Sequence, residues 1–348
     1  MSSGPGQRER RQAIAICVPV RNEAERLSRL FRSLDRLETA QHHRIHVSLL
    51  LDGCTDASAA IASTYRQTSA HHVHLAEAPA GEPNAGRARG RAMALGSEAL
   101  SDDEGILLTT DADSWPQPNW LRAMVSALDH ADVVAGDVVR TGRRPSGQQD
   151  RLDRYYGALY ALRRRIDPVP WEATTAHHHA SGANMGMRIR TYRRLGGFRP
   201  VSRAEDALLV DDASRAGLRV RRDAASVVVT SDRRRGRVPQ GFAKTLYDLE
   251  TEGLAEIEVA HPVDQVWQYR AHSVGRRCYE QSLFDPLTEM IGLSADHLLG
   301  VARDCPNAEA FAMRVVPVPP TGMREIGFPA AEAFLATLIA SSSNACAA

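Results

Sequence analysis

The sequence lacks a hydrophobic run long enough to cross a membrane, and its cysteines form no disulfide framework. No apolar stretch approaches the roughly 20 residues that a bilayer-spanning helix needs. Residues 1–12 are polar and basic, with no apolar segment of signal-peptide length behind them. The five cysteines are scattered, odd in number and never in a C-x-x-C pair, which suits a reducing compartment. These absences predict a soluble, cytoplasmic protein, with peripheral contact to a membrane as the alternative.

Net charge is almost absent as well. The 43 basic and 42 acidic residues leave a formal charge of +1. A chain so balanced has no overall field that gathers nucleic acid or anionic lipid, and it shows no recognisable nucleic-acid-binding module. We therefore expect no nucleic-acid partner, and any anion-binding site must be local. The 43% hydrophobic content of the 348 residues supports a substantial core, in one large α/β domain or two smaller ones.

Short β-rich runs alternate with helical patterns through the first half of the chain. The runs are residues 13–18, 45–51, 72–76, 105–110 and 133–138, and the helical segments are 23–37, 56–68, 87–99 and 118–128. This alternation predicts a mostly parallel sheet with helices on both faces. Ligands of such sheets bind beyond the carboxyl ends of the strands, so the polar residues after each run are the candidate site.

The second half of the chain is predicted to be largely helical. Residues 140–150 are polar and contain Gly and Pro, which indicates a connection, and 155–165 follow as a helix. Beyond residue 238 the helical segments are 240–255, 263–283, 287–302 and 330–339. The two ends, residues 1–12 and 341–348, are expected to be flexible.

Two carboxylates one residue apart, Asp111 and Asp113, follow the apolar run at 106–108. Such a pair suits a hard divalent cation, Mn²⁺ or Mg²⁺, which shares its remaining positions with a diphosphate. The metal would neutralise charge on a departing nucleoside diphosphate. Aspartates in turns also cap helices, so this motif alone leaves both interpretations open.

Taken in order, the motifs resemble those of the family-2 glycosyltransferases over residues 13–240. The resemblance rests on the segment 14–23, the Asp52-Gly53-Cys54-Thr55-Asp56 pattern, the stretch 84–89, Asp111-Ala112-Asp113, and the segments 180–188 and 196–206. It implies the Rossmann-like GT-A fold and an inverting transfer from a nucleotide sugar. It also implies that Asp113 and Asp111 are metal ligands. The residues that it implies for binding the donor are Pro19, Arg21, Glu23, Asp52, Asn84, Arg89, Asp111 and Ala112.

On the acceptor side the resemblance implies that Gly182, Ala183 and Asn184 shape the sugar and acceptor pocket. Asp206 is then the candidate base that deprotonates the acceptor hydroxyl, and Glu205 positions the acceptor. Both acidic residues also stand where they could cap a helix at 207–216, and the two roles are compatible.

Two further clusters are candidates for binding an anion or a metal ion. Arg233 and Arg237 lie in a basic loop that could clamp the diphosphate, or that is simply a solvated surface. His177, His178 and His179 are adjacent, so their side chains diverge and at most one or two can face one ion. The sequence does not identify a third residue that would bind the metal ion together with Asp111 and Asp113.

The sequence thus predicts single addition of a sugar to an acceptor hydroxyl, because the Q-x-x-R-W motif of processive members is absent. A UDP-sugar donor is favoured over a GDP-sugar, and the acceptor is open. The predicted division is a domain at 13–240, with a nucleotide-binding half at 13–139 and an acceptor-binding half at 140–240. A helical extension at 241–340 would bind the acceptor or pair two chains as a homodimer.

Two other functions compete with this hypothesis. A nucleotidyltransferase of similar fold normally has a Gly-rich basic loop after its first strand, and residues 19–23 contain no glycine. A non-catalytic protein that only binds nucleotide sugars would not need Asp113, Glu205 and Asp206 together.

Overall fold

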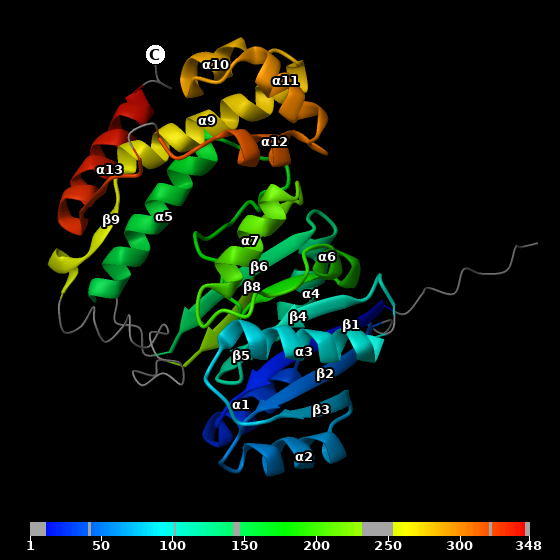
Figure 1. Cartoon of the computed structure of the whole chain (residues 1–348). Helices are drawn as coiled ribbons and strands as arrows, with labels where there is room; N and C mark the ends of the chain where they lie inside the picture. Colours follow the sequence, from blue (N-terminus) through cyan, green and yellow to red (C-terminus); the bar gives the residue numbers. More distant parts are fainter. Residues whose placement is uncertain are drawn as a thin grey trace, which may run out of the picture.

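An eight-stranded sheet forms the centre of the computed structural model, which describes residues 12–40, 43–100, 102–141, 147–231, 253–319 and 322–344 (Figure 1). The strand order is β3-β2-β1-β4-β7-β6-β8-β5. The strands are β1 (Gln12–Val20), β2 (His43–Asp52), β3 (His72–Ala78), β4 (Ile106–Thr109), β5 (Ser114–Pro116), β6 (Val133–Arg140), β7 (Met185–Arg188) and β8 (Val220–Thr230).

Helices cover both faces of this sheet, as the alternation of runs predicts. They are α1 (Ala24–Leu34), α2 (Ser58–Thr68), α3 (Ala85–Leu100), α4 (Trp120–Leu128), α6 (Ile189–Arg194) and α7 (Glu205–Arg215). Successive β1 side chains serve opposite faces: Ile14 and Ile16 pack in the core that includes residues of α1, α2 and α4, while Ala15 packs in the core that includes residues of α3, α6 and α7.

The sheet is mostly parallel but contains antiparallel pairs. Strand β1 pairs in parallel with β2 and β4, β2 with β3, and β6 with β8. Strand β7 lies antiparallel between β4 and β6, and β5 is antiparallel to β8. Neither β5 nor β7 was predicted, because each has only three or four residues and neither is a continuous apolar run like that of β4.

The segment predicted as a connection at 140–150 is partly helical. Helix α5 (Gln148–Ile166) begins seven residues before the predicted 155, and β6 continues to Arg140. The side chains of Arg140 and Asp153 form an ion pair at 3.0 Å, which ties the end of the strand to this first part of the helix.

The C-terminal part contains α9 (Pro262–Gln281), α10 (Asp285–Ile291), α11 (Ala295–Arg303), α12 (Ala308–Val315) and α13 (Phe328–Asn344). It also has a 3₁₀ turn, η1 (Leu254–Glu256), and the antiparallel pair β9 (Glu258–Ala260) and β10 (Glu325–Gly327). The single helix predicted at 287–302 is two helices, because Gly292 leaves α10 with φ +74°, a conformation that glycine adopts without strain. Most of the helix predicted at 240–255 lies outside the described residues.

Helix α5 connects the sheet to this C-terminal part (Figure 1). Its residues Tyr155, Leu159 and Leu162 pack in a core with Phe328 and Leu335 of α13. A helix placed by sequence in the acceptor-binding half thus shares its core with the extension. The boundary at 240 stays a prediction.

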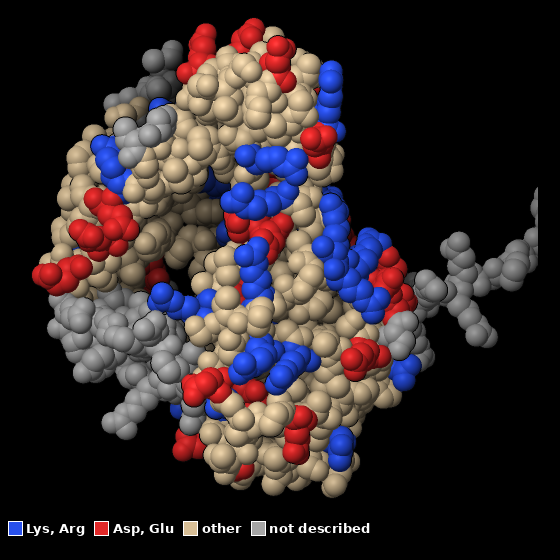
Figure 2. Space-filling view, in the orientation of Figure 1, with Lys and Arg blue, Asp and Glu red and all other residues tan. Residues whose placement is uncertain are grey.

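Basic and acidic side chains are intermixed over the face shown in Figure 2, in keeping with the small net charge. The same face is hollowed between the C-terminal helices and the sheet (Figure 2). Within the described ranges, no helix combines the length and the apolar character needed to cross a bilayer.

Candidate functional site

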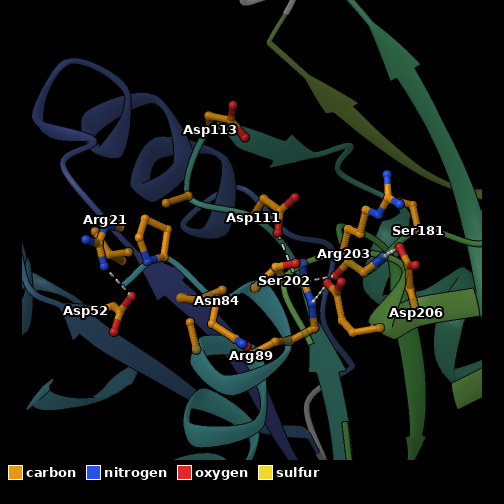
Figure 3. A pocket seen from close by; sticks show the side chains of 18 of the residues that line it. Arg21, Asp52, Asn84, Arg89, Asp111, Asp113, Ser181, Ser202, Arg203 and Asp206 are labelled. Carbon is orange, nitrogen blue, oxygen red and sulfur yellow. Dashed lines mark hydrogen bonds and ion pairs between the residues drawn. The ribbon is translucent and has the colours of Figure 1, made fainter. Parts of the chain in front are cut away.

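A cavity of about 380 Å³ opens where β1, β2 and β4 end (Figure 3). Its wall contains twelve of the residues that the sequence singled out: Pro19, Arg21, Glu23, Asp52, Asn84, Arg89, Asp111, Ala112, Asp113, Gly182, Glu205 and Asp206. These residues come from six separate segments of the chain. The carboxyl ends of the parallel strands bring the donor-side segments to one edge of the sheet, as the topology rule predicts.

Asp52 is buried at the end of β2 and is held by Arg21. Arg21 Nη1 donates to Asp52 Oδ2 at 3.0 Å, and its Nη2 donates to the Gly81 carbonyl at 2.8 Å. Gly53 follows with φ +60°, and a Cβ there would come within 2.7 Å of Ala80 Cα. Only glycine allows this close approach, which brings the loop around residue 81 beside Asp52.

Asn84 caps the start of α3 at the cavity. Its Oδ1 accepts from Arg87 N at 2.7 Å, and its Nδ2 donates to the Pro200 carbonyl at 2.9 Å. Gly86 packs so tightly that a Cβ would lie 1.9 Å from the Arg199 carbonyl oxygen. The N-terminal end of a 16-residue helix therefore opens on the cavity, where the positive end of its dipole favours an anion.

Arg89 lies at the centre of the site and is buried. Its Nε donates to Glu205 Oε1 at 3.1 Å, and its Nη1 lies 3.0 Å from Asp111 Oδ1. Nη1 also donates to the Gly182 carbonyl at 2.6 Å. Burial alone would lower the pKa of Arg89, but the Asp111 and Glu205 carboxylates outweigh it and raise that pKa above its usual range. One arginine thus links the donor and acceptor sides of the cavity.

Glu205 and Asp206 begin α7, directly after Ala204 in the left-handed region at φ +58°. Glu205 is 5% exposed, and burial raises its pKa, with Arg89 opposing the shift and Asp206 adding to it. Asp206 is half-buried; its Oδ2 accepts from Gly182 N at 2.9 Å, and its Oδ1 accepts from Ala207 N at 2.8 Å. Asp206 therefore bonds the first turn of α7 and lines the cavity at the same time.

Asp111 and Asp113 reach the same cavity from the turn between β4 and β5 (Figure 3). Asp113 Oδ2 accepts from the Ser231 hydroxyl at 2.7 Å, and the Asp111 side chain is 37% exposed. Both supply the oxygen ligands that Mn²⁺ and Mg²⁺ prefer, so the pair fits such an ion. In the described part of the chain, no third Asp, Glu, His or Cys completes a three-ligand group with them.

Ala183 and Asn184 do not line this cavity. Asn184 is fully buried: its Oδ1 accepts from Trp120 Nε1 at 2.7 Å, and its Nδ2 donates to the carbonyls of Asp137 and Ser226. The side chain therefore joins α4, β6 and β8 behind the cavity wall. Arg233 and Arg237 lie outside the described residues.

The structure adds residues to the cavity that sequence reasoning missed. They are chiefly Pro83, Ser202 and Arg203, whereas Ser181 comes from the segment 180–188 that the resemblance already included. Ser202 and Arg203 are exposed in the polar segment between Phe198 and the acidic pair, and this position was the only available signal. Trp115, which follows Asp113 closely in the chain, is buried in β5 under Arg29 and is therefore not available to stack on a ligand.

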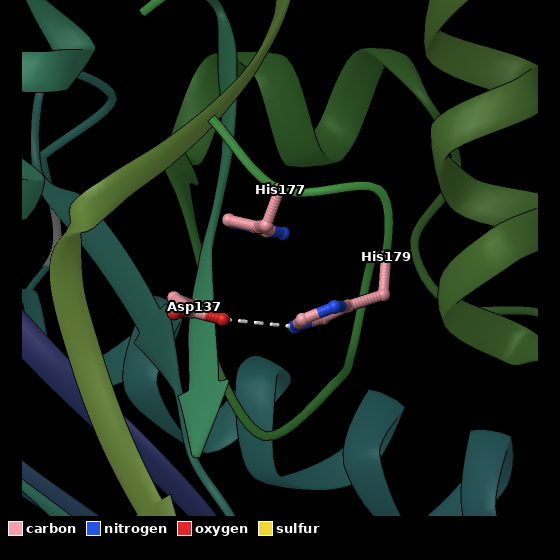
Figure 4. A group of neighbouring side chains, drawn as sticks. All are labelled: Asp137, His177 and His179. Atoms are coloured by element: carbon pink, nitrogen blue, oxygen red, sulfur yellow. Dashed lines mark ion pairs between the residues drawn. The ribbon is translucent and has the colours of Figure 1, made fainter. Parts of the chain in front are cut away.

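A second cluster of polar side chains lies apart from this cavity and consists of Asp137, His177 and His179 (Figure 4). One ligand atom of each lies within 4.8 Å of the others. His177 and His179 are two residues apart in the chain and face the same point, while burial lowers the pKa of His177 and of His178 to about 4. Both of those imidazoles are therefore neutral at pH 7.

Comparison with known proteins identifies the family of the chain and solved structures with a similar fold. The sequence profile described as Glycosyl transferase family 2 matches residues 15–191. No curated protein matches the chain significantly. Among solved structures, GalNAc-T7 with UDP, GalNAc and Mn²⁺ is similar at 15% identity and a TM-score of 0.51, over 90% of this chain and 59% of that one.

Two other solved structures align with this chain over more of their own length. S. aureus TarS 1–349 with UDP-GlcNAc is 15% identical over 88% of this chain and 90% of that one, with a TM-score of 0.47. The mannosyltransferase PcManGT from Pyrobaculum calidifontis with GDP-Man and Mn²⁺ is 18% identical over 98% and 82%, with a TM-score of 0.46. The expected GT-A fold is confirmed by the profile match and by the likeness to GalNAc-T7.

Proposed function

Because this chain belongs to glycosyl transferase family 2, we propose that it transfers one sugar from a nucleotide-sugar donor to an acceptor hydroxyl by a metal-assisted, inverting displacement. A single observation carries the proposal. One cavity gathers a carboxylate pair, the N-terminal end of α3 and the half-buried Asp206. These are the parts that a diphosphate leaving group and an attacking hydroxyl require.

The donor side would bind the nucleoside diphosphate. The α3 N-terminus would offer the positive end of its dipole to the diphosphate, while Asp52, oriented by Arg21, would accept from the nucleobase. We favour a UDP-sugar, with a GDP-sugar as the alternative. GalNAc-T7, which has the same fold, was crystallised with UDP and Mn²⁺, in line with this preference.

Asp111 and Asp113 would hold the divalent ion, Mn²⁺ or Mg²⁺. The ion would neutralise the charge that grows on the departing diphosphate. Asp113 is oriented for this by Ser231, and Asp111 by its contact with Arg89.

Asp206 would act as the base. Its carboxylate takes the proton from the acceptor hydroxyl while that oxygen forms its bond to the anomeric carbon, and the bond from this carbon to the diphosphate oxygen breaks. Attack from the face opposite the leaving group inverts the anomeric configuration. Gly182 N–H holds the carboxylate in place, and Glu205, buried against Arg89, acts as a positioning residue.

Thermal unfolding with a panel of nucleoside diphosphates, each with and without Mn²⁺, tests the proposal. A ligand at about a hundred times its dissociation constant stabilises the fold by roughly 2.7 kcal/mol, so a matching nucleotide shifts the midpoint clearly. We expect one nucleotide to give a shift that depends on Mn²⁺. Asp113→Asn should remove the Mn²⁺-dependent part of the shift, whereas Asp206→Asn should keep it.

Slow hydrolysis of the donor, in which water replaces the acceptor, separates binding from chemistry. Asp206→Asn should lower this hydrolysis by about 100-fold or more, the usual range for loss of a general base. Nucleotide binding without hydrolysis in the parent chain would favour the non-catalytic alternative. The absence of a shift with every nucleotide would contradict the proposal itself.

A further inference from the structure

Asp137, His177 and His179 lie outside the donor cavity, and the proposed transfer uses none of them. Asp137 stands on β6, while the two histidines lie in the segment that leads to β7 (Figure 4). The backbone carbonyl of Asp137 accepts from the buried Asn184 amide at 2.8 Å. The backbone of one member of the cluster is therefore anchored to a buried side chain.

His177 presents an unused lone pair. Its Nε2 donates to the Ala135 carbonyl at 3.1 Å, which leaves Nδ1 as the unprotonated nitrogen. That Nδ1 is buried and has no hydrogen-bond partner among the described residues. A buried acceptor without a partner costs free energy, unless a ligand satisfies it. Donation of the other ring N–H to a carbonyl is also the usual arrangement of a metal-binding histidine.

His179 and Asp137 face one another across a short gap. His179 Nε2 lies 3.3 Å from Asp137 Oδ1, and the same nitrogen accepts from Val138 N–H at 3.3 Å. An unprotonated Nε2 has a single lone pair, and Val138 N–H and the Asp137 carboxylate oxygen both lie 3.3 Å from this nitrogen. A cation bound between His179 Nε2 and Asp137 Oδ1 would be attracted to both atoms.

We propose that Asp137, His177 and His179 bind a transition-metal ion of the Zn²⁺ class, at a site distinct from the Asp111 and Asp113 carboxylates. Two imidazole nitrogens and one carboxylate oxygen suit Zn²⁺, Co²⁺ or Ni²⁺, whereas Mn²⁺ and Mg²⁺ favour oxygen ligands. The three ligand atoms lie within 4.8 Å of one another. A small inward movement brings them to bond lengths of about 2.0–2.2 Å.

The ion would join β6 to the segment that continues into Ser181 and Gly182. Gly182 contacts both Arg89 and Asp206, so the site would brace one wall of the donor cavity from behind. Its role is structural, and it adds no step to the transfer.

Metal binding to the purified full chain, stripped with a chelator, tests the proposal. Zn²⁺ titration by calorimetry should give one tight site per chain, and Co²⁺ should give the visible absorption bands of a nitrogen-ligated ion. His177→Gln and His179→Gln should each weaken binding by more than about 100-fold, the upper end of what loss of an outer partner costs. His178→Gln is the matched control: this neighbour stacks on Tyr156 and should leave binding unchanged.

The donor site supplies the second control. Asp113→Asn should keep the Zn²⁺ site, and His179→Gln should keep Mn²⁺-dependent nucleotide binding. Circular dichroism of each metal-free variant checks its fold, and Asp137→Asn replaces a histidine variant that does not fold. The proposal is overturned if the parent chain binds no Zn²⁺ tightly. Equal binding by His179→Gln, or loss with Asp113→Asn, would overturn it too.

Discussion

Arg89 and Glu205 form a buried ion pair whose partners lie far apart in the sequence. The two side chains are 7% and 6% exposed and meet at 3.1 Å. Arg89 also meets Asp111, but that carboxylate is 37% exposed and so retains water as an alternative partner. The main contribution of Arg89 to the stability of the fold is therefore to neutralise the charge of the buried Glu205 carboxylate.

We expect Arg89→Met to destabilise the fold by about 3–5 kcal/mol, because it leaves a buried carboxylate without its cation. Adding Glu205→Gln should recover about 0.5–3 kcal/mol, since the two residues are coupled. Adding Asp111→Asn should recover little. Urea unfolding of the single and double variants measures these differences, and equal recovery by both second changes would contradict the assignment.

At the scale of elements, α12 supports the helix that begins with the acidic pair. Asn307 caps α12, where its Oδ1 accepts from Ala310 N at 3.0 Å, and its Nδ2 donates to the Gly217 carbonyl at 2.7 Å just after α7. Gly217 has φ +73°, and a Cβ there would lie 2.5 Å from Asn307 Oδ1. The end of α7 and the start of α12 are thus fitted to one another.

Asn307→Ala should cost about 1–2 kcal/mol, which combines a lost cap with an orphaned carbonyl. The control is Ser294→Ala, which removes only the cap of α11, a 3.3 Å bond to His297 N. We expect Asn307→Ala alone to speed hydrogen exchange at amides around residue 217. Equal cost and equal exchange in the two variants would show that α12 does not support α7.

On the scale of the whole molecule, α5 belongs to two parts of the structure. It follows β6 in the chain, yet Tyr155, Leu159 and Leu162 pack against η1, α9 and α13. Arg276 of α9 pairs with Asp167, directly after α5, and with Glu309 of α12. Helix α5 and the extension are therefore linked through side-chain packing and ion pairs as well as through the chain.

A chain that ends at residue 252 should bind a hydrophobic dye and aggregate, because it exposes the apolar face of α5. Changing Tyr155, Leu159 and Leu162 to Gln in the same truncated chain should restore solubility. Size-exclusion chromatography and dye fluorescence report both outcomes. A soluble truncated chain with the parent unfolding midpoint and no added Gln would mean that residues up to 252 fold without the extension, and would contradict this prediction.

Much of the donor side could be predicted because its signals are local. Asp52 and Asp111 each follow an apolar run, and parallel strands of one sheet must end at the same edge. The helix starting at Glu205 also has a local signal, since acidic residues favour a helix N-terminus. Each of these inferences needs only neighbouring residues and the geometry of one sheet.

The sequence by itself therefore determined the alternating elements, the family resemblance and the polar ends of the strands. Tertiary structure alone decided that Arg89 joins Asp111 to Glu205, that Asn184 lies behind the cavity wall, and that His177 and His179 meet Asp137. The physical reason is the sequence separation over which each kind of interaction acts. Propensity and periodicity act over a few residues, whereas these contacts depend on how β7 and the helices pack after distant segments have been brought together.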